Sequence, residues 1–157
     1  RALIFYGGAI HRDLKQEMLD SFYFQWRHEP LVIDQWLVTQ AIDPSEGALC
    51  RVKALIDHKV FDIKNPNKVR SLIGAFCSQN HIHFHNRDGD GYEFLADKVI
   101  QLDEINPQIA ARLLAPLTRW KSVDEKRQGL MQVQLQRIKA SSTLSKDVYE
   151  VVEKSTI

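Results

Sequence analysis

The sequence has no long apolar run and no excess of charge of one sign, and each absence excludes a class of protein. No stretch approaches the ~20 apolar residues that a membrane-spanning helix needs, and no signal-peptide pattern opens the chain. Lys and Arg total 21 against 20 for Asp and Glu, a net charge of +1 without any long basic run. Nucleic-acid-binding proteins usually show a basic excess or patch. We therefore expect a protein that meets neither a membrane nor nucleic acid.

Cysteine is also scarce, and the chain does not begin with Met. Cys50 and Cys77 are the only cysteines, and they lack a metal-binding spacing. Two such residues are typical of reduced, buried thiols in a cytosolic protein, so we expect a cytoplasmic location; one disulfide is the alternative. The chain opens at Arg1 on the apolar run from Ala2 to Tyr6. We interpret this start as the cut edge of a larger protein.

What the sequence does contain is apolar residues at helical spacing. Hydrophobic residues make up 44% of the chain, enough for a packed core. Val69, Leu72, Ile73 and Phe76 follow the i, i+3, i+4, i+7 pattern of a buried helix face. The expected helix starts share capping residues or proline at the first helical position. They are Asp13, Pro30, Asp43-Pro44-Ser45, Asn65-Pro66, Asn106-Pro107, the capping box of Ser122 with Glu125, and Ser145.

The spacing of the expected helix starts and breaks indicates a repeat. Residues 79–91 are predicted to form a loop, and Pro116 is predicted to kink or break its helix. The two Asn-Pro starts, at 65 and 106, are 41 residues apart, close to the period of helical-hairpin solenoids. No long strand-like alternation is present. We predict one all-α domain over residues 1–157, a superhelical stack of antiparallel helix pairs (an armadillo- or HEAT-like α-solenoid) with about eight helices.

Three histidines alternate in the segment HIHFH, and alternation is a metal-binding pattern if the segment is a strand. His81, His83 and His85 would then project to one side and could bind a transition metal. The alternative is a solvated loop whose Ile82 and Phe84 face inward. No acidic or thiol ligand stands at a supporting spacing, so we favour the loop and expect no metal in this chain.

Two other segments resemble metal motifs only in part. Asp88-Gly89-Asp90-Gly91 begins like a calcium loop, but the twelfth position holds Val99 where a bidentate Glu is needed. We interpret it as a turn before a helix. His28-Glu29 begins like a zinc-protease helix, but the position of the second His is occupied by Val32.

No catalytic group is predicted in this chain. Cys77 has His81 four residues later, a nominal nucleophile and base, but Cys77 belongs to the apolar end of its helix. No serine nucleophile elbow or phosphate-binding loop occurs.

A candidate binding site combines a glutamine with two arginines. Gln108 and Arg112 stand four residues apart near an expected helix start, so they share one helix face. Unpaired N–H groups at a helix start favour anions. Arg70 occupies a similar place one repeat earlier. Together they would suit a carboxylate such as a peptide C-terminus. Composition and spacing alone, however, favour the simpler interpretation of surface or structural arginines.

Several long strings resemble one protein family over nearly the whole chain. They are FxxQWRHEPLVIDQW at 22–36, NPNKVRSLIGAF at 65–76, DGDGYEFLAD at 88–97, NPQIAARLLAPLTRW at 106–120, DEKRQGLMQ at 124–132 and LSKDVYE at 144–150. They resemble the C-terminal domain of the bacterial aminopeptidase N family, which belongs to the gluzincin zinc aminopeptidases of alanyl aminopeptidase type.

The resemblance implies a function for the larger protein. Such an enzyme removes N-terminal residues from peptides with a zinc ion held by an HExxH helix, and a GxMEN loop holds the substrate amine. Neither motif is present here, so this chain alone should be inactive. The resemblance implies an α-superhelical domain that packs on the catalytic domain of the same polypeptide and encloses its active-site chamber. It implies that Arg112, Gln108 and Arg70 contact the peptide substrate downstream of the cleaved bond.

A free-standing helical-repeat adaptor that binds a protein segment in its groove is the alternative function. Such an adaptor should have polar capping repeats and a native Met start, which this sequence lacks. A nucleic-acid-binding module is disfavoured by the net charge.

Overall fold

The protein is a stack of α-helices, seen in a computed structural model that describes the backbone of residues 9–156 and the side chains of residues 13–156. The elements are α1 (Ala9–Trp26), α2 (Pro30–Ala41), α3 (Ala48–Ile56), α4 (Pro66–Val69), the π-helical turn η1 (Arg70–Gly74), α5 (Ala75–Gln79), α6 (His81–Phe84), α7 (Asp90–Asp103), α8 (Pro107–Leu113), α9 (Ala115–Thr118), the 3₁₀ turn η2 (Trp120–Ser122), α10 (Glu125–Lys139) and α11 (Lys146–Ser155). The described residues contain no strand. The apolar run at residues 2–6 lies outside them.

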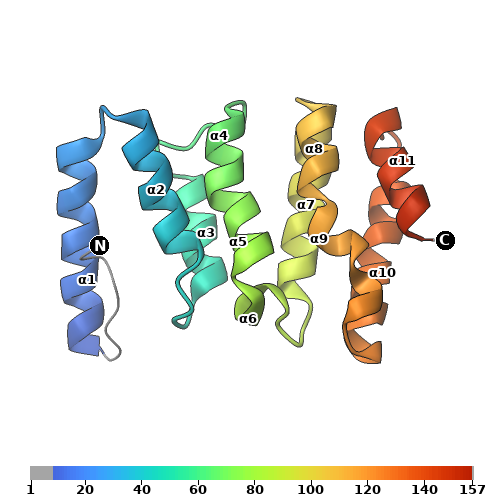
Figure 1. Ribbon diagram of the computed structural model, residues 1–157, viewed down its shortest axis with the longest axis horizontal. Coiled ribbons are helices and arrows are strands. Elements are labelled where there is room, and N and C mark those ends of the chain that lie inside the picture. Colours follow the sequence, from blue (N-terminus) through green and yellow to red (C-terminus); the bar gives the residue numbers. More distant parts are fainter. Residues whose placement is uncertain (1–8, 157) are drawn as a thin grey trace.

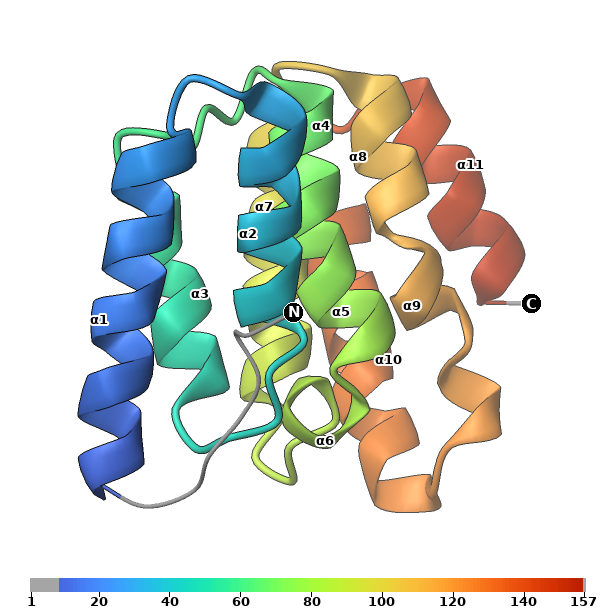
Figure 2. The ribbon, with the colours of Figure 1, turned by 60° about the vertical axis from the view of Figure 1, so that its left-hand side comes forward.

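The helices stand side by side from α1 at one end to α11 at the other (Figure 1). They form two layers, with α3, α7 and α10 behind α2, α5, α8 and α11 (Figures 1 and 2). Helices pack within each layer and between them, as α2 does on η1, α7 on α8 and α11 on α8. This arrangement confirms the predicted α-solenoid of helix pairs. Within residues 9–156, none of the helices combines the length and hydropathy required to span a bilayer.

The core is made by the apolar faces that the sequence predicted. Val69, Leu72, Ile73 and Phe76 are each at most 1% exposed, and the stripe of Met131, Leu135 and Ile138 on α10 is fully buried as well. The segment 66–79 is one continuous rod of α4, η1 and α5, whose buried face packs on α2 and α3. This rod forms one wall of the candidate site described below.

Three helices begin with the predicted capping bonds. The side-chain oxygen of Asn65 accepts a hydrogen bond from the backbone N–H of residue 67 at 3.0 Å, and that of Asn106 accepts one from residue 109 at 3.3 Å. Pro66 and Pro107 follow at the first helical position. Ser145 Oγ accepts from the N–H of residue 148 at 3.2 Å. These local bonds fix where the rod, α8 and α11 start.

Two of the predicted caps are wrong. Asp13 lies inside α1, which begins at Ala9. The capping box of Ser122 and Glu125 does not form, because Asp124 caps α10 and accepts a hydrogen bond from the Arg127 N–H at 3.1 Å. Ser122 belongs instead to η2, and its hydroxyl donates to the backbone carbonyl of Arg119, the residue before that turn.

The break at Pro116 and the helix α6, which lies within the predicted loop 79–91, give the described residues more helices than the eight expected. Pro116 breaks its helix rather than kinking it: α8 ends at Leu113, and α9 begins two residues later. A proline ring at this position crowds the carbonyl of the residue four before it, here Arg112. The segment Asp43-Pro44-Ser45 forms the turn expected there, in which the Asp43 side chain accepts from the residue 45 N–H, but no helix starts at it, because α3 begins at Ala48.

Candidate functional site

A cavity of about 290 Å³ lies between the rod of residues 66–79 and helix α8. The rod contributes the longer wall and α8 the shorter one, and both walls carry an arginine. The lining residues are Pro66, Val69, Arg70, Gly74, Ala75, Ser78 and Gln79 from the rod, and Ile109, Arg112 and Leu113 from α8. The cavity therefore combines apolar side chains with two guanidinium groups, a hydroxyl and an amide.

The rod's local structure helps to open this space. Its middle turn, Arg70–Gly74, is π-helical, and π turns inside α-helices frequently occur at functional sites. Gly74 faces the cavity without a side chain: a Cβ there would lie 3.8 Å from Arg70 Cγ and 3.9 Å from Leu113 Cδ1. Alanine would fit but would fill the gap between the two walls.

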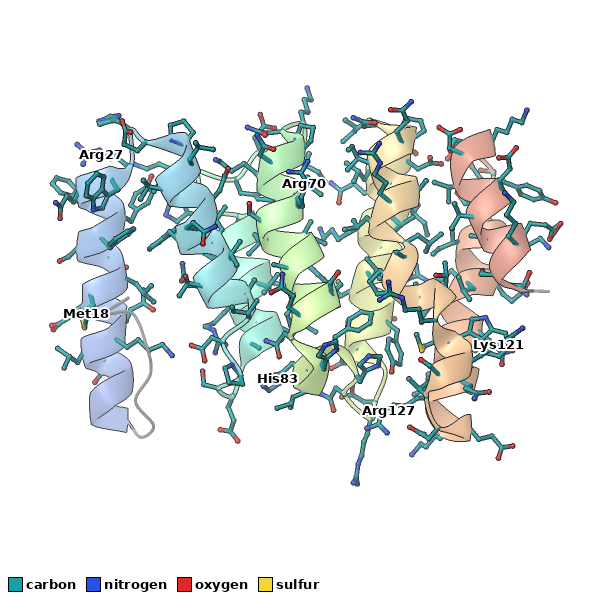
Figure 3. The ribbon with its side chains drawn as sticks, in the orientation of Figure 1. Met18, Arg27, Arg70, His83, Lys121 and Arg127 are labelled. Carbon is teal, nitrogen blue, oxygen red and sulfur yellow. The ribbon has the colours of Figure 1, made fainter. Side chains whose placement is uncertain are left out.

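The cavity is electrostatically positive. Arg70 Nη1 donates a hydrogen bond to the Asn67 side-chain oxygen at 2.9 Å, but neither Arg70 nor Arg112 forms a salt bridge with any residue that the structure describes. No Asp or Glu is among the lining residues. Arg70 is labelled in Figure 3, on the upper part of the rod. Two unneutralised guanidinium groups at one cavity are suited to a carboxylate, which arginine binds in bidentate geometry.

The structure unites only part of the predicted triad. Arg70 and Arg112, 42 positions apart in the chain, line the same cavity. Gln108 is exposed in the first turn of α8 and is not among the lining residues. The helix-start argument for anion binding does not apply, because α8 has only 7 residues and the cavity lies along its side.

Sequence reasoning missed Ser78 and Gln79 of the lining. A signal was available for Ser78, because Arg70, Gly74 and Ser78 are spaced four residues apart and such residues share one helix face. Gln79 offered no comparable signal, since it is the last residue of α5. Together the two side chains add a hydroxyl and an amide beside the guanidinium groups.

The HIHFH segment is neither a strand nor a loop but the one-turn helix α6. His83 Nε2 lies 2.8 Å from the Pro44 carbonyl oxygen, and His85 Nδ1 lies 2.6 Å from the Tyr92 hydroxyl. Phe84 faces inward as predicted and is fully buried. Ile82 does not, since it is 70% exposed, because residues two apart on a helix point to nearly opposite sides.

The other candidate segments have structural roles. Burial raises the pKa of the Cys77 thiol, so it stays protonated at neutral pH and is a poor nucleophile. Cys50 is exposed, which corrects the expectation that both thiols are buried; both are free. The Asp88 side chain accepts from the Asp90 N–H at 3.0 Å, and α7 begins at Asp90, so this segment is the predicted turn before a helix.

These features define the class of protein: a helical-repeat domain with a positively charged cavity between neighbouring repeats. Residues 3–157 match the protein-family model described as "Domain of unknown function (DUF3458_C) ARM repeats". The chain belongs to this family.

The relatives of the chain are aminopeptidases. It is 44% identical to the aminopeptidase N of Haemophilus influenzae over 88% of its own length, and 40% identical to that of Escherichia coli over 94%. It also superimposes on the crystal structure of Legionella pneumophila aminopeptidase A in complex with aspartic acid, with a TM-score of 0.88 and 36% identity over 94% of the chain. The chain spans only 16–17% of the length of these proteins. The resemblance stated from the sequence is thereby confirmed.

Proposed function

We propose that this chain is the C-terminal domain of a zinc-dependent aminopeptidase, where it encloses the active-site chamber and binds the peptide downstream of the cleaved bond. The observation that carries the proposal is the cavity with Arg70 and Arg112, which holds two guanidinium groups and no carboxylate. The similarity of the chain to three aminopeptidases over 88–94% of its length supports this assignment. The free-standing adaptor loses support because the chain covers only a small part of each relative.

The chemical step belongs to the other part of the polypeptide. The described residues contain no group of three His, Cys, Asp or Glu side chains that could hold a metal ion. They therefore do not fit a zinc site. A location in the cytoplasm likewise remains a prediction.

The domain's own contribution is positioning. A peptide bound in the chamber by its N-terminus places its far end against the domain that closes the chamber. Arg70 and Arg112 would hold a carboxylate there by charge-assisted hydrogen bonds, while Ile109 and Leu113 offer apolar contact to the neighbouring side chain. Fixing the far end of a short peptide raises the fraction bound in a productive geometry. Gln108, on the rim of α8, would contact the peptide outside the cavity.

The test compares peptides with a free C-terminal carboxylate and with a C-terminal amide in the intact enzyme. Charge-assisted hydrogen bonds are worth ~1.5–3 kcal/mol, so Arg112→Gln should lower kcat/KM for the free acid at least about tenfold. The amide peptide should lose little. Arg87→Gln is the matched control, because Arg87 is also exposed but is not among the residues that line this cavity.

Equal losses for the acid and amide peptides would show that Arg112 does not bind the carboxylate. An unchanged kcat/KM for both would remove the cavity from the substrate path altogether. Arg70→Gln, measured in the same way, tells whether the second guanidinium group shares the carboxylate.

A further inference from the structure

A second cavity, of about 190 Å³, adjoins the first one. Both are lined by Ser78, so they meet at the end of the rod. The other polar residues of the second cavity are His81 and His85, from α6 and the residue after it, and Arg119 and Ser122, which follow the Pro116 break. The two cavities are therefore neighbours, and a single groove through both would run between α5–α6 on one side and α8–α9–η2 on the other.

The fixed charge of the second cavity comes from Arg119. This residue forms no salt bridge with any residue in the described part of the chain, and no Asp or Glu is among the lining residues. Asp124, the acidic group whose charge reaches His85, is paired with Arg127 at 2.7 Å. An anion that enters this cavity therefore meets an arginine that is not already neutralised.

The two histidines of this cavity, His81 and His85, contribute hydrogen-bonding groups, whereas Arg119 contributes the charge. Burial, together with the neighbouring His81 and Arg127, lowers the pKa of His85, so its ring is neutral near pH 7. Its Nδ1 is engaged with the Tyr92 hydroxyl. The His81 ring stacks on that of His85 with centroids 6.2 Å apart and an interplanar angle of 13°. These rings, with the hydroxyls of Ser78 and Ser122, supply hydrogen-bonding groups around the Arg119 charge.

We propose that the second cavity binds the carboxylate side chain of an acidic residue in the same peptide whose terminal carboxylate occupies the first cavity. The substrates that this domain favours would then be peptides with Asp or Glu near the C-terminus. The inference rests on the proposed function, because it assumes that a peptide lies in the groove. It goes further by assigning Arg119 and its cavity to a particular class of peptide.

The length of the rod sets the spacing between the two carboxylates. Ser78 marks where the two cavities meet, and it lies eight positions after Arg70, or ~12 Å along the axis at a rise of ~1.5 Å per residue. An extended peptide advances ~3.3 Å per residue, so it crosses this distance in about four residues. The acidic side chain should therefore stand about four residues before the C-terminus.

The experiment measures kcat/KM of the intact aminopeptidase on hexapeptide pairs that differ only by Glu or Gln at one position. The wild type should prefer Glu about three- to fivefold at the position four residues before the C-terminal one, the discrimination typical of a partly exposed ion pair. Arg119→Gln should abolish the preference and Arg119→Lys should restore part of it. Arg119 is exposed, so these substitutions leave the core intact, and Arg87→Gln is again the control.

The outcomes separate this inference from the proposed function. If Arg119→Gln leaves the Glu/Gln ratio unchanged at every position while Arg112→Gln still removes the acid/amide difference, the second-cavity assignment is overturned and the proposed function stands. If neither variant changes its ratio, both fail. If Arg119→Gln only relieves inhibition by added inorganic phosphate, the cavity takes free anions, and the peptide assignment is again overturned.

Discussion

Any side chain at Gly91 should destabilise the fold, because there is no space for a Cβ atom at this position. It is the second residue of α7, and its backbone φ is not in the left-handed region, so alanine suits its conformation. A Cβ at this position, however, would lie 2.8 Å from both the Cα and the carbonyl carbon of Phe84, and closer still to its oxygen. These are backbone atoms of α6, which cannot swing away as the end of a side chain can.

The magnitude follows from two opposing terms. Replacing glycine with alanine inside a helix stabilises a protein by ~0.5–1 kcal/mol, whereas overpacking typically costs ~1–3 kcal/mol and sometimes more. Relief requires moving Phe84, whose fully buried ring packs on Phe76 and Tyr92 at centroid distances of 6.5 and 5.2 Å. Because the contacted atoms belong to the backbone, the overpacking cost should lie near ~3 kcal/mol, and we therefore expect Gly91→Ala to lower the free energy of unfolding by ~2 kcal/mol.

The same substitution at Gly129 is the matched control. Gly129 is exposed on α10, and a Cβ there meets no heavy atom within 4 Å. Gly129→Ala should raise Tm by ~1–4 °C, while Gly91→Ala should lower it by ~4–8 °C or more, because ~1 kcal/mol corresponds to ~2–4 °C at this chain length. Thermal unfolding followed by circular dichroism at 222 nm measures both. A Gly91→Ala protein as stable as wild type would refute the close approach of α6 to the start of α7.

Two further predictions concern the last helix and the two thiols. Ser145→Ala should lower the free energy of unfolding, measured in urea, by ~2–3 kcal/mol, because it removes the α11 cap and the hydroxyl that donates to the buried Asp103 carboxylate at 2.5 Å. The control Ser142→Ala, at an exposed site, should change that free energy by less than ~0.5 kcal/mol. Equal effects of the two substitutions would contradict the reasoning. A chromogenic disulfide reagent should label Cys50 within minutes in the folded protein, and it should label Cys77 only on unfolding, because Cys77 is buried and has a raised pKa. Rapid labelling of a Cys50→Ser protein would show that the wall of the second cavity, to which Cys77 belongs, opens in the folded protein.

Local chemistry was sufficient to predict three of the helix starts. Asn65, Asn106 and Ser145 each cap the helix that their position indicates. Ser122 and Asp124 stand two residues apart, and either could cap α10. The choice falls on Asp124 because η2 ends at Ser122, a condition that depends on the path of the chain after the Pro116 break.

The HIHFH segment shows a different limit. Alternation of histidine with apolar residues predicts a strand or a loop, and only the neighbouring contacts make it a helix. Phe84 fills the core between α5 and α7, and the His83 ring contacts the carbonyl oxygen of Pro44, 39 positions earlier. Contacts of this range have no signal in a single sequence, since they depend on which helices become neighbours.

The candidate site was partly predictable because the repeat period places equivalent positions on the same side of the stack. The Asn-Pro starts recur after 41 residues, and the arginines that follow them, Arg70 and Arg112, are 42 positions apart, within one residue of this period, and line one cavity. The same interval of 41 relates Ser78 to Arg119, which line the second cavity. Gln108 was predicted to belong to the site because it is one helical turn from Arg112, not because of the repeat period, and it is the one predicted site residue that does not line the cavity. In this solenoid, residues of a cavity are therefore found one turn away, as Ser78 is from Gly74, and also one repeat away, as Arg119 is from Ser78.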